Sequence, residues 1–486
     1  MTKKVVLSIV FFMIVISGVF AKVKLPAIIS SNMVLQRDAD VALWGWADTN
    51  ETLRIETSWL QNPVEVKVNS DGKWFVRVKT TLSKQAQTIR IKGNDSDILL
   101  ENILFGEVWL CSGQSNMQMP VKGNSGQPIY GSQEAIINAD NPNLRLFSVG
   151  RVGSVTPLQD LENYQSWEAA DPKNVSNFSA VGYFFASQLQ KLLDVPVGII
   201  HTSWGSSPVE SWTSKEVLSK YMTVDLSQVN EKTRMNKTPV VLFNAMINPL
   251  IPFTLKGFLW YQGEANRSEP EQYKVLLPAM VNDWRTRWEN QEAPFYFAQI
   301  APFRYGGNTF FQEVQNSAFQ REAQLQCVDS ISNSGIAITL DVGDQRSIHP
   351  PKKKEVADRL LGLALNKTYG FQGFDPESPS YDSMKLQNNG ILLDFKNGNG
   401  LYSYDDLKGF EIAGKDHVFY PAEAKIINGR GVFVSSPKVP NPEAVRYAWN
   451  NWVEASLYGT NQLPVSSFRT DRWEEASRFN DQENQK

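Results

Sequence analysis

Cysteine and histidine are scarce in this chain of 486 residues, which contains two cysteines and three histidines. Two cysteines allow at most one disulfide, so a framework of disulfides cannot hold the fold together. Cys111 and Cys327 form either a single bridge or two buried thiols. The second interpretation is favoured, because free cysteine packs as a small apolar side chain.

Runs of one charge are also missing. The 48 basic and 51 acidic residues are mixed along the chain and give a net charge of −3. No basic run could follow a phosphate backbone, so nucleic acid is a poor candidate partner. Beyond residue 21 no stretch is long and apolar enough to cross a bilayer, so the mature chain has no predicted membrane span.

The one extended apolar run, residues 5–20, stands at the amino terminus. Lys3 and Lys4 precede it, and it ends in the small-residue pattern Val19-Phe-Ala21. This pattern predicts a signal peptide over residues 1–21, cleaved near Ala21, and an exported protein in the periplasm or outside the cell. A membrane anchor is the less favoured alternative, because a span needs about 20 apolar residues.

Two regions of short alternating segments flank a middle region of a different pattern. Residues 22–104 predict an N-terminal β domain, and residues 373–470 predict a second, C-terminal β domain before a polar tail at 471–486. In residues 105–372 apolar strands alternate with amphipathic helices, which indicates an α/β domain with a parallel sheet. Its expected strands and helices are Glu107–Cys111, Val197–His201, Gly257–Tyr261, Phe295–Ile300, Gly335–Leu340, Ala180–Leu193 and Lys352–Leu365.

Ser115 follows the first of these strands and a Gly-Gln pair, and precedes the start of a predicted helix. Its hydroxyl would therefore lie at the carboxyl end of a parallel strand, where open α/β sheets bind their ligands. Free amides at a helix start can also bind an oxyanion. On spacing alone, a serine that only caps a helix fits equally well, because Met117 stands where an α/β-hydrolase elbow has its second glycine.

Gly113-Gln-Ser-Asn-Met117 resembles the first block of the sialate O-acetylesterase family, a branch of the SGNH hydrolases. Trp260-Tyr-Gln-Gly-Glu-Ala-Asn266 and Ile348-His-Pro350 resemble its central and last blocks, in the same order. Weaker similarities extend over nearly the whole mature chain. The resemblance implies a flavodoxin-like SGNH hydrolase core, with helices on both faces of a parallel sheet, flanked by N- and C-terminal β domains. It also implies a serine esterase without metal or organic cofactor.

A serine nucleophile needs a base, and histidine is the usual one because its pKa lies near neutrality. His417 lies beside Asp416 in the C-terminal β region and is expected at the surface. His201 ends a predicted strand and is expected in the core or in a supporting position. His349 lies in a loop after a strand, so elimination and resemblance both select it as the base.

The third member of a triad is less easily assigned. SGNH enzymes commonly have an aspartate three residues before the histidine, and many relatives have an acid two before it. These positions here are Arg346 and Ser347. Glu264, Asp344 and Asp341 are the candidates to orient the imidazole. Glu264 is favoured because it follows a predicted strand, and a backbone carbonyl as orienter stays open.

Acyl transfer also requires donors aimed at the oxyanion. The resemblance implies the amides of Ser115 and Gly205 and a side-chain amide, for which Gln262 is the candidate. Serine at position 206 replaces a glycine of the family pattern.

The substrate expected from the resemblance is O-acetylated sialic acid, whose carboxylate Arg267 or Arg304 could bind as a bidentate pair. An acetylxylan or other plant-glycan esterase is the alternative of the same class. A catalytically inactive carbohydrate-binding protein and a lipase are alternatives of other classes. The acetyl position and the oligomeric state are left open by the sequence.

Overall fold

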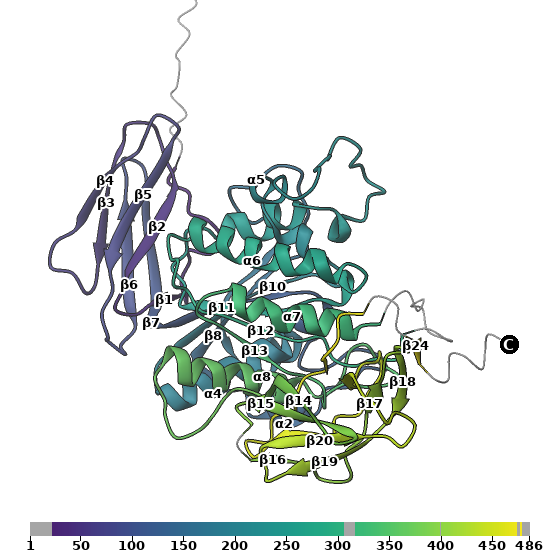
Figure 1. The fold of residues 1–486 in the computed structure, drawn as a ribbon. Helices are drawn as coiled ribbons and strands as arrows, with labels where there is room; N and C mark the ends of the chain where they lie inside the picture. The colour runs from purple at the N-terminus through teal and green to yellow at the C-terminus, as the bar shows by residue number, and fades with distance from the viewer. Residues whose placement is uncertain (1–21, 306–315, 399, 474–476, 479–486) are drawn as a thin grey trace, which may run out of the picture.

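A mostly parallel sheet lies at the centre of the molecule, with helices on both faces and smaller antiparallel sheets beside it (Figure 1). The computed structural model describes residues 22–305, 316–398, 400–473 and 477–478. The predicted signal peptide and the last residues of the predicted polar tail lie outside the described residues.

The central sheet has the strand order β13-β12-β11-β7-β10-β8-β9. All neighbouring strands on this path run parallel except β8 and β9. This arrangement confirms the predicted α/β class. The strands are β7 (Asp97–Gly113), β8 (Asn141–Val149), β9 (Tyr164–Ala170), β10 (Val197–Ser203), β11 (Gly257–Tyr261), β12 (Phe295–Ala298) and β13 (Ser334–Ala337).

Helices cover both faces of this sheet because its strands are apolar on both sides. Along β7, Val108 and Leu110 join one hydrophobic cluster, whereas Trp109 and Cys111 join another on the opposite face. The first face packs against α6 (Pro270–Arg287), which contacts α7 (Ala318–Ser330), and the second against α4 (Ala180–Leu193) and α8 (Lys353–Leu363). The short helices are α1 (Ser115–Gln118), α2 (Ser132–Ile137), α3 (Pro172–Asn177) and α5 (Lys215–Leu218).

The predicted elements of the core are present, and two of them have the predicted bounds, β11 and α4. Strand β12 ends two residues before the predicted Ile300, because the Ile300 amide donates to the Gln324 side chain. Helix α8 continues into a π-helical turn, η6 (Ala364–Thr368).

The N-terminal β region is joined to the core by one continuous strand. The first half of β7 pairs with β6 and then β1, and the second half enters the central sheet. The predicted boundary between residues 104 and 105 therefore falls inside β7. The other strands of this region are β1 (Val34–Gln36), β2 (Asp40–Trp46), β3 (Thr52–Thr57), β4 (Val64–Lys67), β5 (Lys73–Lys79) and β6 (Gln87–Lys92).

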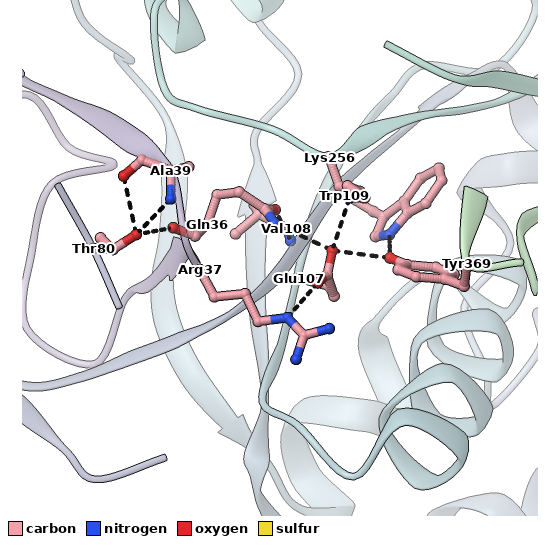
Figure 2. A network of polar contacts seen from close by, with 9 residues as sticks. All are labelled: Gln36, Arg37, Ala39, Thr80, Glu107, Val108, Trp109, Lys256 and Tyr369. Atoms are coloured by element: carbon pink, nitrogen blue, oxygen red, sulfur yellow. Dashed lines mark hydrogen bonds and ion pairs between the residues drawn. The ribbon is translucent and has the colours of Figure 1, made fainter. Parts of the chain in front are cut away.

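A buried glutamate lies where these two regions join (Figure 2). Glu107 is 2% exposed, and its carboxylate accepts hydrogen bonds from Arg37 Nε at 2.6 Å and Gln36 Nε2 at 3.2 Å, both from the N-terminal region. Tyr369 directly follows η6, and its hydroxyl donates to the same carboxylate at 3.0 Å. Lys256 Nζ lies 4.0 Å from Glu107 Oε2. We call this set the Glu107 network, and it connects three parts of the chain.

The C-terminal region consists of small sheets whose strands pair antiparallel, except β18 and β24. Its strands are β14 (Ser380–Gln387), β15 (Gly390–Lys396), β16 (Leu401–Tyr402), β17 (Phe410–Ala413), β18 (Val418–Pro421), β19 (Glu423–Ile427), β20 (Gly431–Ser435), β21 (Ala444–Tyr447), β22 (Tyr458–Gly459), β23 (Phe468–Arg469) and β24 (Ser477–Arg478). Strand β24 lies within the predicted polar tail and pairs with β18.

Two further predictions concern disulfides and membrane spans. Cys111 and Cys327 are both buried free thiols, which confirms the favoured interpretation. No helix within the described ranges has the length and apolar character that a bilayer span requires.

Candidate active site

Ser115 lies at the point where β7 passes into α1. At Gly113 the backbone has φ +138°, and a Cβ there would lie 2.2 Å from the Tyr261 carbonyl oxygen, so only glycine fits. The Gln114 amide donates to that same carbonyl at 3.0 Å. The turn therefore places the partly exposed Ser115 at the carboxyl end of the sheet, between β11 and β10.

Ser115 and His349 line one cavity, of about 370 Å³, although 234 positions separate them in the sequence. His201 and Ser203, at the end of β10, line it as well. The remaining lining residues are mostly polar: Gln118, Met119, Pro120, Lys122, Asn124, Ser148, Val149, Gly150, Arg151, Gln165 and Asn177. The structure thus brings together the predicted nucleophile and the predicted base.

The loop that carries His349 is held by its own polar side chains. Asp344 Oδ1 accepts from the amides of Arg346 and Ser347, at 2.7 and 2.9 Å. Ser347 Oγ accepts from the His349 amide at 3.1 Å. Burial, and secondarily the charge of Lys353, lowers the pKa of His349 to about 4. The imidazole is therefore neutral near pH 7 and able to accept a proton.

The other two histidines are arranged differently. His201 Nε2 lies 2.5 Å from Ser203 Oγ, and burial lowers the pKa of His201 to about 4. His417 stacks on Trp473 in the C-terminal region, with 3.9 Å between ring centroids. His201 thus reaches the cavity while its Nε2 is engaged by a neighbour, which is a supporting position.

None of the three carboxylates predicted to orient His349 bonds to its ring in the described residues. Glu264 accepts from Asn116 Nδ2, and Asp341 forms a bidentate pair with Arg359 at 2.7 Å for both contacts. Among the described residues, Asp344 accepts from the backbone amides of its own loop. The buried His349 Nδ1 has no hydrogen-bond partner within the described ranges. The preference for Glu264 as a direct orienter is thus not met by this geometry.

The predicted oxyanion donors are only partly assembled. Gly205 adjoins Ser115, since a Cβ at Gly205 would lie 3.3 Å from the Ser115 Cβ, and its amide donates to Gln118 Oε1 at 2.8 Å. Gln262 is fully buried, and its Nε2 donates to the Ser207 carbonyl at 3.1 Å and to Asn266 Oδ1 at 2.7 Å. The side-chain amide nitrogen of Gln262 already donates to these two loop acceptors. In this structure it therefore does not take the predicted role of oxyanion donor.

Three residues near the site carry no prediction from the sequence: Gln118, Asn116 and Lys353. Gln118 lines the cavity and contacts the Gly205 amide. Asn116 and Lys353 are buried and hydrogen-bonded to each other. A signal for Lys353 exists in the sequence, because it lies three and four positions before the apolar Val356 and Ala357 and so extends the buried face of α8.

The two arginines predicted to bind substrate do not line this cavity. Arg267 donates to the Glu264 carbonyl and stacks on Tyr305, and Arg304 is exposed. The lining contains two other cationic side chains, Arg151 and Lys122. Lys122 Nζ donates to Asn177 at 2.6 Å. No group of three His, Cys, Asp or Glu side chains suited to a metal ion occurs in the described parts of the chain.

Comparison with known proteins identifies the family of this chain. The family model described as carbohydrate esterase, sialic acid-specific acetylesterase, matches residues 106–356. Sialate O-acetylesterase of Homo sapiens is 28% identical over 477 residues, covering 87% of each chain, and that of Rattus norvegicus is 27% identical, covering 90% of this chain and 93% of its own. The crystal structure of a carbohydrate acetylesterase from Xanthomonas citri is 33% identical, covers 93% of this chain and all of its own, and has a TM-score of 0.84. This chain belongs to the sialic acid-specific acetylesterase family of carbohydrate esterases.

Proposed function

We propose that this chain is an exported serine esterase that removes O-acetyl groups from sialic acid. The observation that carries the proposal is the shared cavity, in which Ser115 and a neutral His349 meet beside mostly polar side chains. A polar cavity suits a sugar, and only a small acyl pocket is needed for acetate. Export is supported by the amino-terminal pattern of residues 1–21.

The reaction is a double displacement. Ser115 Oγ attacks the acetyl carbonyl while His349 takes its proton, and the tetrahedral intermediate collapses as His349 returns that proton to the departing sugar hydroxyl. Water, deprotonated by His349, then attacks the acetyl-enzyme and releases acetate. The amides of Ser115 and Gly205 are the proposed backbone donors, and Gly205 becomes available when Gln118 turns away from it. Gln118 replaces Gln262 as the proposed side-chain donor because it lines the cavity.

The proposed recognition of sialic acid depends on Arg151. Its side chain is exposed and lines the Ser115 cavity, where a guanidinium can bind a carboxylate as a bidentate pair. Neutral sugars such as xylan carry no carboxylate. Arg151 would therefore favour sialic acid over neutral sugars.

The test compares acetate release from 9-O-acetylated sialic acid and from acetylated xylan, by the wild type and two arginine variants. We expect hydrolysis of the sialic acid ester, with a KM raised about tenfold in Arg151→Met, since a hydrogen bond to a charged group contributes about 1.5 kcal/mol. Arg304→Met is the matched control and should leave KM unchanged. Activity confined to xylan would overturn the sialic acid assignment, and an equal effect of both variants would overturn the role of Arg151.

A further inference from the structure

A chain of buried polar side chains lies behind Ser115 and His349. Lys353 Nζ donates to Asn116 Oδ1, and Asn116 Nδ2 donates both to Glu264 Oε1 and to the Ile348 carbonyl, the latter at 3.1 Å. The side chains of Lys353, Asn116 and Glu264 are 0%, 1% and 3% exposed. We call these three side chains the Lys353 network.

Burying this network costs desolvation free energy. An ammonium and a carboxylate removed from water lose several kcal/mol each, and apolar residues of similar volume often replace such groups without loss of stability. Burial lowers the pKa of Lys353 to about 7 and raises the pKa of Glu264. Glu264 Oε2 has no hydrogen-bond partner among the residues described. Fold stability alone gives no reason for this arrangement.

The contacts of Asn116 suggest a different purpose. An ammonium can only donate, so Lys353 fixes Asn116 Oδ1 on its own side and directs Asn116 Nδ2 toward Glu264 and the Ile348 carbonyl. Asn116 directly follows the nucleophile, and Ile348 directly precedes the base. The amide of one side chain therefore ties the serine turn to the histidine loop.

On the basis of the proposed function, we infer that Lys353 is a positioning residue for acyl transfer. Acting through Asn116 on the Ile348 carbonyl, it holds the His349 loop beside Ser115, where none of the candidate carboxylates is hydrogen-bonded to the imidazole within the described residues. Lys353 also lies near the start of α8, four positions after His349, with its Nζ 5.5 Å from the centroid of the Tyr261 ring. One lysine thus contacts or is linked to the serine turn, the histidine loop and β11.

The test is Lys353→Met in the full chain, with 4-nitrophenyl acetate as substrate so that sugar recognition is not involved. We expect kcat to fall about tenfold to hundredfold with little change in KM, because a base displaced by about 1 Å loses about that much rate. Removing the positive charge near His349 should also raise the pKa of its imidazole and move the acid limb of kcat/KM to higher pH. Lys352→Met is the matched control, since within the described residues Lys352 Nζ donates to the Asp341 carbonyl, at 3.0 Å, and to no part of the Lys353 network.

A second variant separates positioning from damage to the fold. Lys353→Met alone leaves the Glu264 carboxylate without the nearest link to an ammonium, with Arg267 as a remaining cation that acts on it, whereas Lys353→Met/Glu264→Gln removes both charges of the Lys353 network. We expect the double variant to recover the wild-type melting temperature while kcat stays low. Recovery of kcat together with the melting temperature, or a wild-type kcat in Lys353→Met, would overturn the inference. Full hydrolysis by Ser115→Ala would instead refute the proposed function, so the two failures are distinguishable.

Discussion

Glu107 and Glu264 are both buried glutamates of the central sheet, and they lie at its opposite ends. Glu107, near the point where β7 enters the sheet, has hydrogen bonds to both oxygens, from Arg37, Gln36 and Tyr369 (Figure 2). Glu264, just beyond the carboxyl end of β11, has one oxygen bonded to Asn116 and the other without a partner in the described residues.

The difference extends to the neighbours of the two residues. Buried polar atoms without partners in the described ranges include Ser112 Oγ, Gln262 Oε1 and His349 Nδ1, which belong to residues at the carboxyl end of the sheet, and others such as Ser30 Oγ lie elsewhere. Buried polar groups in native proteins are normally hydrogen-bonded, and the exceptions call for an explanation such as catalysis. The Glu107 network is fully hydrogen-bonded and joins parts of the chain, whereas the carboxyl end, among the residues described, lacks hydrogen bonds at the place where we propose that substrate binds and protons move.

The largest expected effect lies at the carboxyl end. In Ser115→Ala, kcat on 4-nitrophenyl acetate should fall by about 10³-fold or more, because no acyl-enzyme can form. The melting temperature should stay within a degree or so of the wild type, since the Ser115 side chain is partly exposed and small. Steady-state kinetics and a thermal melt measure both. Substantial residual turnover would mean that another residue is the nucleophile.

The Glu107 network should respond in the opposite way. Glu107→Ala leaves Arg37 and Lys256 without their counter-ion and should lower the free energy of unfolding by about 3 kcal/mol. The loss stays at the low end for a buried pair because those two side chains are 27% and 35% exposed. Urea unfolding provides the measurement, and kcat/KM at 25 °C should be unchanged. A variant that folds normally but loses activity would break the contrast between the two ends.

Much of the fold could be predicted from the sequence where a single periodicity governs the segment. Helix α4 and strand β11 have the expected bounds because their apolar patterns are uninterrupted. The extent of β7 was missed, since a strand that leaves one domain and enters another shows no break in its pattern. Strand β12 is shorter than predicted because a side chain, Gln324, accepts from the Ile300 amide in place of the neighbouring strand.

The site could be predicted only as far as single residues and their order. Ser115 was predicted from its place after a strand and from the family resemblance, and His349 from elimination and the same resemblance; in the structure both line one cavity. The partners of Gln262 and Glu264 depend on which of several amides and carboxylates meet in three dimensions. Lys352, Lys353 and Lys354 are chemically identical neighbours, and only the helix phase shows that the middle one is buried.

The dependence of catalysis on pH gives a smaller effect. The ordinary pKa of a histidine is 6.5, and burial lowers the pKa of His349 to about 4. Its imidazole therefore stays unprotonated at pH values well below 6.5. We expect kcat/KM to be level down to about pH 5 and to fall about tenfold per unit below pH 4. Tryptophan fluorescence at each pH provides the control for unfolding. An acid limb centred near pH 6.5 would show that the site is more open to water than this structure has it.

The smallest expected effect is the change in stability on neutralising Glu264. In Glu264→Gln the side-chain oxygen still accepts from Asn116, so the free energy of unfolding at pH 5 should change by about 1 kcal/mol or less. Burial raises the pKa of Glu264, so the folded chain binds this proton more tightly than the unfolded chain, and wild-type stability from this group falls as pH rises above 4.5. Glu264→Gln has no such ionisation. Its free energy of unfolding, measured in urea, should therefore rise relative to that of the wild type between pH 5 and pH 8. A variant that instead becomes relatively less stable as the pH rises would indicate that Glu264, like Glu107, is held as a satisfied carboxylate, and the two ends of the sheet would then differ in location only.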